Sequence, residues 1–203
     1  ALDKLQLHGV TLVTIEDAGL HALNEPVGFP VVIYEAYDCM VEYLREYGHD
    51  LTIEQVAQRL HSPDVRHIYE NWVLPRKMPV GDQLVDLLPI YQAARDSGRQ
   101  ALRERYQDLF EQYQVDALIF PTTCVVAPLA NEEVNLPSNF ARLIQNTEPS
   151  ASAGLPGIQL PIELGRRSGL PVGTELAVPA WSDRRLLAIG QALESIFGRI
   201  PRA

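Results

Sequence analysis

The chain has 203 residues, of which 46% are hydrophobic and 21% charged, and its 17 basic and 26 acidic side chains give a formal net charge of −9. This acidic, ordinary globular composition argues against binding to nucleic acid or an acidic membrane surface, where basic side chains supply most of the affinity. No apolar run approaches the roughly 18 residues that cross a bilayer, so no membrane association is expected.

The first elements of the chain are expected to be a short helix, a strand and a long helix. Residues 10–15 (VTLVTI) alternate β-branched and aliphatic side chains, which is typical of a strand, and they follow a helix that ends near Gly9. Residues 31–47 carry apolar side chains at helical spacing, and Gly48 is a suitable helix end.

The next third is predicted to be mainly helical. Thr52 is placed to cap a second helix, and Ser62, which precedes a proline, starts a further one. Two prolines and a glycine in residues 74–82 (LPRKMPVGD) indicate a surface loop. Residues 83–113 have a helical pattern that we expect to be broken at Gly98.

Strands are expected in the second half of the chain. The predicted elements are a buried strand over 116–120, an irregular segment over 121–137, strands over 155–164 and 172–178 joined by a hairpin loop over 165–169, and a last helix capped by Ser182 or Asp183. Strands interleaved with long helices predict an α/β fold. We interpret residues 1–203 as a single domain or part-domain, with 1–113 mainly helical and 114–203 forming strands plus a terminal helix.

The common catalytic and cofactor motifs are absent. The five histidines show no metal-ligand spacing, and no glycine pattern indicates a nucleotide, so we expect no metal and no cofactor. The GxSxG elbow is missing, and Ser150 and Ser152 are interpreted as loop residues bonded to their own backbone. The two cysteines lie far apart and fit a reducing cytoplasm. Cys124 is interpreted as a partly buried, unreactive thiol, because nothing in the sequence places His49 or His61 beside it.

Four ordered segments of the second half together resemble a known family. They are 116–123 (DALIFPTT), 146–161 (NTEPSASAGLPGIQLP), 169–176 (GLPVGTEL) and 182–194 (SDRRLLAIGQALE). This arrangement resembles the C-terminal region of amidase-signature enzymes, most closely the indoleacetamide hydrolase and mandelamide hydrolase types. Residues 29–44 and 69–78 look like the helical middle of the same family, so the resemblance covers almost the whole chain. It implies a mixed β-sheet flanked by α-helices.

The resemblance also implies which chemistry this chain lacks. Members of the family hydrolyse amides with a serine nucleophile, a second serine on a cis peptide and a lysine base, carried by a Gly/Ser-rich segment. This sequence has no Gly-Gly and no Ser-Ser dipeptide, and its only lysines are Lys4 and Lys77. A lysine base must be desolvated to reach a useful pKa, and neither sequence context indicates burial. We expect no catalytic residue in this chain, and inactivity of the chain alone.

The resemblance implies that two loops of this chain approach the acyl pocket. Carried over by motif, the loop after the strand over 116–120 would contribute Thr122, Thr123 and Cys124, and the loop before the next strand would contribute Asn146 and Thr147. Polar side chains at strand ends can converge on a ligand. The alternative is that the threonines only cap the strand and Asn146 only makes a turn.

Two residues depart from the family pattern. Thr174 stands where an apolar residue or glutamine is expected, and Trp181 stands where a glycine-rich stretch is expected. Trp181 would narrow the pocket or pack against the missing part of the enzyme. Neither departure affects the catalytic chemistry, but both leave the substrate open.

Three hypotheses about function follow. The first is an amidase whose N-terminal catalytic part, outside this chain, supplies the Ser–Ser–Lys set for hydrolysis of a carboxylic amide, such as an aryl-acetamide, to acid and ammonia. The second is a non-catalytic binding or assembly module that keeps the amidase scaffold. The third is an independent hydrolase that uses Cys124. The expected partners are the N-terminal catalytic part and a small-molecule amide, and the sequence is also compatible with a homo-oligomer.

Overall fold

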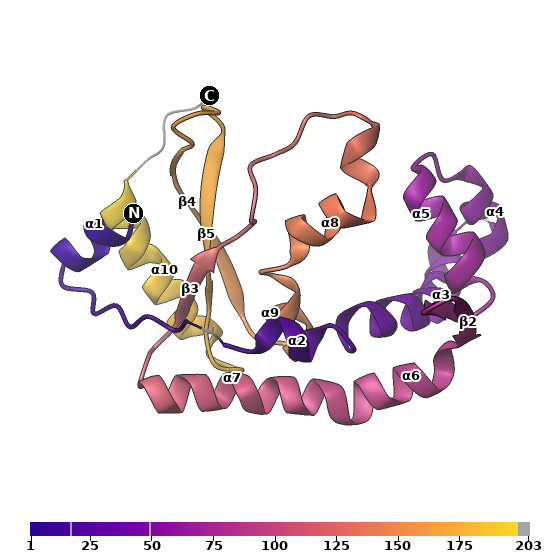
Figure 1. Ribbon diagram of the computed structural model, residues 1–203, viewed down its shortest axis with the longest axis horizontal. Helices are drawn as coiled ribbons and strands as arrows, with labels where there is room; N and C mark the ends of the chain where they lie inside the picture. Colours follow the sequence, from indigo (N-terminus) through magenta and orange to yellow (C-terminus); the bar gives the residue numbers. More distant parts are fainter. Residues whose placement is uncertain (17, 49, 199–203) are drawn as a thin grey trace.

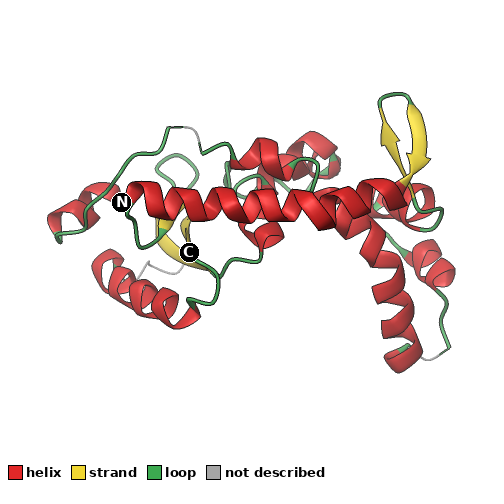
Figure 2. Cartoon of the chain, turned by 90° about the horizontal axis from the view of Figure 1, so that it is seen from below, coloured by secondary structure: helices red, strands yellow, loops and turns green. Residues whose placement is uncertain are grey.

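The computed structural model describes residues 1–16, 18–48 and 50–198, with a three-stranded sheet at one end of the molecule and a group of helices at the other (Figure 1). The helix α6 (Leu87–Ala93), the π-helical turn η2 (Ala94–Gly98) and the helix α7 (Arg99–Tyr113) follow one another as a single rod that connects the two ends (Figure 2). The other helical elements are α1 (Leu2–Leu7), α2 (Leu20–Asn24), α3 (Gly28–Tyr47), α4 (Ile53–Arg59), α5 (Pro63–Ile68), η1 (Tyr69–Val73), η3 (Glu132–Asn135), α8 (Pro137–Ile144), α9 (Glu148–Ala153) and α10 (Asp183–Phe197).

The main sheet consists of β3 (Leu118–Pro121), β4 (Gly157–Leu164) and β5 (Pro171–Ala177), in the order β3-β5-β4, with both pairs antiparallel. Alternate residues of each strand point to opposite faces, and each face is covered by helices. On one face, α10 packs on an apolar cluster that includes Leu160, Leu176, Leu186, Leu193 and Phe197. On the other face, α7 and α9 contribute Leu102, Tyr106, Phe110 and Ala153 to a second cluster. The predicted β4–β5 hairpin is confirmed.

Of the predicted helix starts, Thr52 makes a side-chain capping hydrogen bond, whereas Ser62 and Ser182 occupy N-cap positions without one. Thr52 caps α4 through a complete capping box, in which its hydroxyl accepts a hydrogen bond from the backbone N–H of Gln55 and the Gln55 side chain accepts one from the backbone N–H of Thr52. α5 begins at Pro63 as expected, and α3 ends at Tyr47 but begins earlier than predicted, at Gly28. These signals depend on residues close together in the chain, which is why the helix boundaries could be predicted from the sequence.

The segment predicted to be a surface loop over 74–82 contains half of a second hairpin instead. β1 (Lys77–Val80) pairs with β2 (Gln83–Asp86) through a two-residue turn at Gly81-Asp82, where Gly81 has φ +58°. Glycine tolerates this left-handed conformation, and such turns match the twist of antiparallel strands. The prolines misled the interpretation, because proline is allowed in a strand whose N–H faces solvent.

The helix break predicted at Gly98 is also absent. Gly98 lies in the π-helical turn between α6 and α7, and the rod continues through it. A Cβ at position 98 would come within 2.6 Å of Cγ2 of the buried Val27. Glycine is therefore present because the turn before α3 packs directly against the rod.

The strand predicted over 10–15 does not form. This segment has no regular secondary structure, and residues 11–16 make no backbone hydrogen bond to any described residue. A strand pattern needs a neighbouring strand to form a ladder, and no described residue provides one here.

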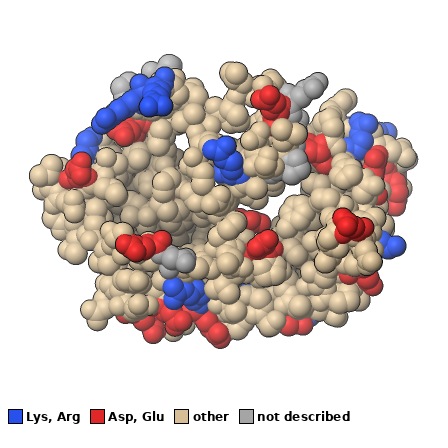
Figure 3. All heavy atoms as spheres, in the orientation of Figure 1, with Lys and Arg blue, Asp and Glu red and all other residues tan. Residues whose placement is uncertain are grey.

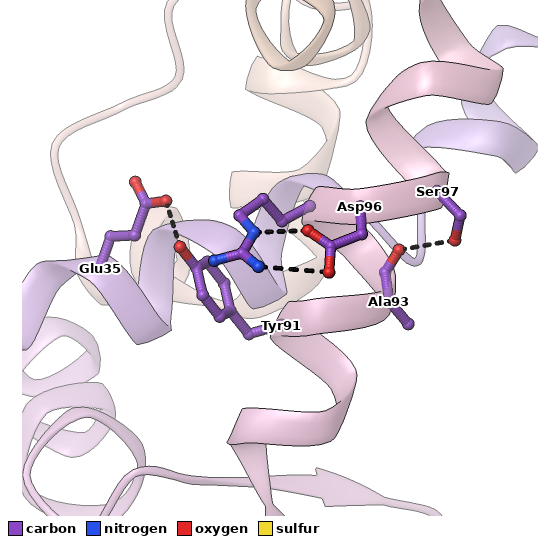
Figure 4. A network of polar contacts seen from close by, with 6 residues as sticks. Glu35, Tyr91, Ala93, Asp96 and Ser97 are labelled. Atoms are coloured by element: carbon purple, nitrogen blue, oxygen red, sulfur yellow. Dashed lines mark hydrogen bonds and ion pairs between the residues drawn. The ribbon is translucent and has the colours of Figure 1, made fainter.

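At the helical end of the molecule, stacked aromatic rings and a guanidinium group pack beside an apolar core formed by Ile33, Leu44, Ile53, Val73 and Leu87. The rings of Tyr34 on α3 and Tyr91 on α6 stack with centroids 4.1 Å apart, and the Arg76 guanidinium lies 4.8 Å from the Tyr34 centroid and 4.6 Å from that of Tyr37. The Tyr91 hydroxyl donates to Glu35 at 3.0 Å, as Figure 4 shows. The stack connects α3, α6 and the start of the β1–β2 hairpin.

We expect Arg76→Ala to lower the free energy of unfolding by about 1–2 kcal/mol, because it removes two cation–π contacts and the hydrogen-bonded ion pair with Asp38. Urea denaturation measures the change. Arg45→Ala is the matched control: its ion pair with Glu42 is exposed on both sides and should contribute about 0–0.5 kcal/mol. Equal effects of the two substitutions would contradict this role of the stack.

Three arginines of α7 connect the rod to distant segments through backbone acceptors. The Nε of Arg99 donates to the carbonyl of Ser152 at 3.0 Å, and that of Arg103 to the carbonyl of Ala153 at 2.8 Å. The Nε of Arg105 donates to the carbonyl of Ala18 at 2.8 Å. The first two acceptors belong to the last turn of α9, where carbonyls have no partner within the helix and cations are favoured.

Candidate functional site

The two loops that the sequence singled out lie side by side in the structure. Asn146, just before α9, donates from Nδ2 to the carbonyl of Pro121 at the end of β3, at 2.7 Å. Its Oδ1 lies 3.6 Å from Sγ of Cys124, which is within range of a thiol hydrogen bond. Asn146 therefore links the loop after β3 to the loop before α9.

The remaining predicted pocket residues differ in what their hydroxyls contact. The hydroxyls of Thr123 and Thr147 donate to nearby carbonyls, those of Val125 at 2.7 Å and Ile144 at 3.2 Å. The Thr122 Oγ1 is buried, and no described residue gives it a hydrogen-bond partner. A buried hydroxyl without a partner carries a desolvation cost, and because the chain's own atoms cover the Thr122 oxygen, no ligand reaches it in this arrangement of the loops.

Cys124 differs from the expectation of a partly buried thiol, because the structure places it at the surface. Its recorded neighbour is the amide oxygen of Asn146, which is not a base. A nucleophilic cysteine needs a base or a cation beside it. His49, one of the histidines considered as a partner for Cys124, lies outside the described residues.

The two residues that depart from the expected pattern have different surroundings. Thr174 is buried in β5, and its hydroxyl donates to the carbonyl of Phe120 on β3 at 2.9 Å. Trp181 is 96% exposed and has a left-handed backbone with φ +65°. An indole so fully in water makes almost none of the contacts that usually bury this side chain.

A polar cluster that sequence reasoning missed lies behind the site. Ser150, interpreted as a loop residue, lies inside α9, and its buried hydroxyl contacts the carbonyl of Thr147 at 3.0 Å and the carboxylate of Glu175 at 3.4 Å. Burial raises the pKa of Glu175, and the Ser150 hydrogen bond partly offsets this. Burial and the Glu175 charge likewise raise the pKa of Tyr106. The sequence signal for this cluster was Glu175, a charged residue within the otherwise uncharged predicted strand over 172–178.

We expect Glu175→Gln to stabilise the protein more at pH 7.5 than at pH 4.5. Because the folded-state pKa of Glu175 is raised, its contribution to stability is complete below the unfolded value of about 4.3 and is lost as the pH rises through the folded pKa. Glutamine keeps an acceptor for Ser150 and cannot ionise. Urea midpoints at the two pH values measure the difference, and Glu163→Gln, at an exposed carboxyl on β4, is the control. A pH-independent effect of Glu175→Gln would contradict the prediction.

A second half-buried carboxyl, Glu148, lies at the start of α9. Burial raises its pKa, and the Asn24 side chain and the His21 charge counteract this. Gly28 leaves room for it, because a Cβ at position 28 would lie 2.3 Å from the Glu148 Oε1. The contact anchors α9, and therefore Asn146 and Thr147, against the start of α3.

A long groove runs past the site along the outer side of β3. It has a volume of about 1140 Å³, and Asn146 is part of its wall. Figure 3 shows a broad hollow on this face whose surface atoms are largely uncharged. Most of the lining is apolar and comes from residues within 9–16 and 18–22, from α7, from residues 114–120 and from α10.

The described residues contain no group of three or more His, Cys, Asp or Glu side chains that could hold a metal ion. Within the same part of the chain, no helix is both long and apolar enough to span a bilayer.

The comparisons with known proteins agree on one family. The family model described as Amidase matches residues 1–187. Mandelamide hydrolase of Pseudomonas putida is 36% identical over 202 residues, 99% of this chain and 40% of that protein. Indoleacetamide hydrolase of Agrobacterium vitis is 33% identical over 92% of this chain and 39% of that protein. A crystal structure of an amidase superposes with a TM-score of 0.68 and 25% identity, over 97% of this chain and 40% of that one. The chain thus spans about 40% of the length of the curated relatives it matches.

Proposed function

Because the chain belongs to the amidase family, we propose that it is the C-terminal portion of an amidohydrolase that cleaves a carboxylic amide to an acid and ammonia. The proposal rests on one combination: the match covers nearly the whole chain but about 40% of the relatives, and the chain has no Gly-Gly or Ser-Ser dipeptide. The Ser–Ser–Lys set would then lie in an N-terminal part outside this chain. The fold is that of the corresponding part of a solved amidase, as predicted.

In this proposal, residues 1–203 form a part-domain that completes the acyl pocket. Asn146, which lies in the groove wall, would hold the loops in place through its bond to the Pro121 carbonyl, and Thr122 would belong to the same loop with its hydroxyl turned inward. Thr123, Cys124 and Thr147 would form the surrounding wall. The relatives named for mandelamide and indoleacetamide suggest an aryl amide as the substrate. A cytoplasmic location remains a prediction.

The experiment joins the part of the Pseudomonas putida mandelamide hydrolase outside the matched stretch to the front of this chain. Ammonia release from mandelamide is then measured for this chimera, for the chain alone and for the mandelamide hydrolase part alone. Activity is expected in the chimera only, because each piece lacks half of the site.

Two outcomes would contradict the proposal. A folded chimera that binds the amide without turnover would favour the binding module. Hydrolysis by the chain alone, abolished by Cys124→Ser, would favour the Cys124 hydrolase.

A further inference from the structure

The C-terminal end of α9 is capped partly by another helix. The N–H groups of the two residues that follow α9 donate to two of its last four carbonyls, at 3.0 Å each. The remaining two carbonyls, those of Ser152 and Ala153, accept hydrogen bonds from Nε of Arg99 and Nε of Arg103 on α7. The last four carbonyls of a helix have no partner within it, so these arginines complete the cap.

The spacing of the two arginines matches this task. Arg99 and Arg103 are four residues apart on α7, which places their side chains on the same face of the rod, and they bond to consecutive carbonyls of α9. Their positive charges lie at the negative end of the α9 dipole. The chain then turns away at Gly154, where φ is +74° and where a Cβ would lie 3.7 Å from Nη2 of Arg103.

α9 is a short helix whose position depends on its contacts. It has six residues, whereas isolated helices below about 12–15 residues are marginal in water. The pocket residues Asn146 and Thr147 directly precede it, and the Ser150 hydroxyl inside the helix donates to the Thr147 carbonyl at 3.0 Å. At about 1.5 Å per residue, only about 9 Å separates the capped end from the pocket loop. A shift at one end is therefore passed to the other.

The other contacts of α9 lie nearer its start. Glu148 packs against Gly28, and Ser150 contacts Glu175 on β5 at 3.4 Å. The two arginines act at the opposite end and connect α9 to the rod. Since the rod also carries Leu102 and Tyr106 of the cluster between α7, α9 and the sheet, α9 is held against a fixed element.

We propose that Arg99 and Arg103 are positioning residues for amide hydrolysis. They hold the end of α9 and so set the places of Asn146 and Thr147 in the wall of the acyl pocket, without touching the substrate. The inference rests on the proposed function, because the pocket is completed by the catalytic part outside this chain. Arg103 is the better residue to substitute, since its side chain is exposed and its truncation leaves no cavity in the core.

Steady-state kinetics of the chimera with the mandelamide hydrolase part test this role. Arg103→Ala should lower kcat/KM for mandelamide about fivefold to tenfold, because a small displacement of the pocket wall disturbs the reacting geometry. Arg105→Ala is the matched control: it lies on the same helix and donates from Nε to a carbonyl at the same 2.8 Å, but that carbonyl belongs to Ala18. It should lower the urea midpoint as much as Arg103→Ala and change kcat/KM less than about twofold.

A double-mutant cycle shows whether Arg103 acts through the Asn146 loop. In the Asn146→Asp background the loop is already displaced, so adding Arg103→Ala should lower kcat/KM further by less than about twofold. A role in stability alone would give the same factor in both backgrounds. Equal losses of kcat/KM for Arg103→Ala and Arg105→Ala, or full multiplication of the Arg103 and Asn146 factors, would overturn the proposal.

Amide hydrogen exchange on this chain separates the proposal from the proposed function. The Ala151 amide donates to the Thr147 carbonyl at 3.2 Å, and Arg103→Ala should speed its exchange about tenfold, whereas Arg105→Ala should not. An Ala151 rate that Arg103→Ala leaves unchanged would overturn the proposal. A folded chimera of the unsubstituted chain that releases no ammonia would instead contradict the proposed function, and the Ala151 rate would still decide whether Arg103 holds α9.

Discussion

Replacing Asn146 by aspartate is expected to lower kcat/KM for amide hydrolysis in the chimera about tenfold to a hundredfold, since a displacement near 1 Å can cost that much. The Asn146 Nδ2 donates to the Pro121 carbonyl at 2.7 Å and holds the two pocket loops together. Aspartate has no hydrogen to donate, so a carboxylate would face a carbonyl and push the loops apart. Steady-state kinetics with mandelamide measure the effect.

The control separates lost positioning from lost stability. Asn139, on α8 seven residues before Asn146, also donates from Nδ2 to a backbone carbonyl, that of Glu133 at 2.6 Å. Asn139→Asp should reduce the free energy of unfolding by about 1 kcal/mol, as Asn146→Asp does, and leave kcat/KM unchanged. An activity loss that is equal in both variants would show that Asn146 acts only through stability.

Tyr106→Ala is expected to lower the free energy of unfolding by about 3–5 kcal/mol, the usual cost of deleting a buried aromatic side chain. The ring is 1% exposed and lies in the cluster that joins α7 and α9 to the sheet. For a protein of this size, the thermal midpoint should fall by about 10 °C. Calorimetry or thermal denaturation followed by circular dichroism measures the shift.

Tyr43→Ala is the matched control for this prediction. Tyr43 lies on α3 with 59% of its surface exposed and contacts Tyr47 at a centroid distance of 5.4 Å. Its removal should change the free energy of unfolding by about 0.5 kcal/mol. A loss below about 1 kcal/mol for Tyr106→Ala would mean that the α7 cluster is loosely packed.

The sequence predicted elements whose signals are local. Thr52 acts as a cap because its hydroxyl reaches Gln55 three residues later, and the β4–β5 hairpin follows from two strand patterns around a short loop. The errors arose where tertiary contacts decide the outcome. Gly98 suggested a helix break, whereas its role is to admit Val27 against the rod.

The strand pattern over 10–15 shows a different limit of sequence reasoning. The alternation is real, but a strand exists only with a neighbour, and the described chain offers none to residues 11–16. The candidate site was likewise only partly predictable from the sequence. The motif indicated which loops to consider, but the bond from Asn146 to Pro121 and the cluster of Ser150 with Glu175 join residues that are 25 positions apart in each case.

The three arginines of α7 predict an uneven tolerance to mutation. Their acceptors are the carbonyls of Ser152, Ala153 and Ala18, which are main-chain atoms that every residue type carries. Substitutions at Ser152 or Ala18 keep the hydrogen bond from the arginine, because the acceptor is the main-chain carbonyl. The donors have no such freedom, because lysine lacks the planar fork that positions Nε. A saturation scan should therefore find Ser152 and Ala18 more permissive than the arginines that bond to them, whereas Ala153 is constrained by its burial in the cluster of α7 and α9.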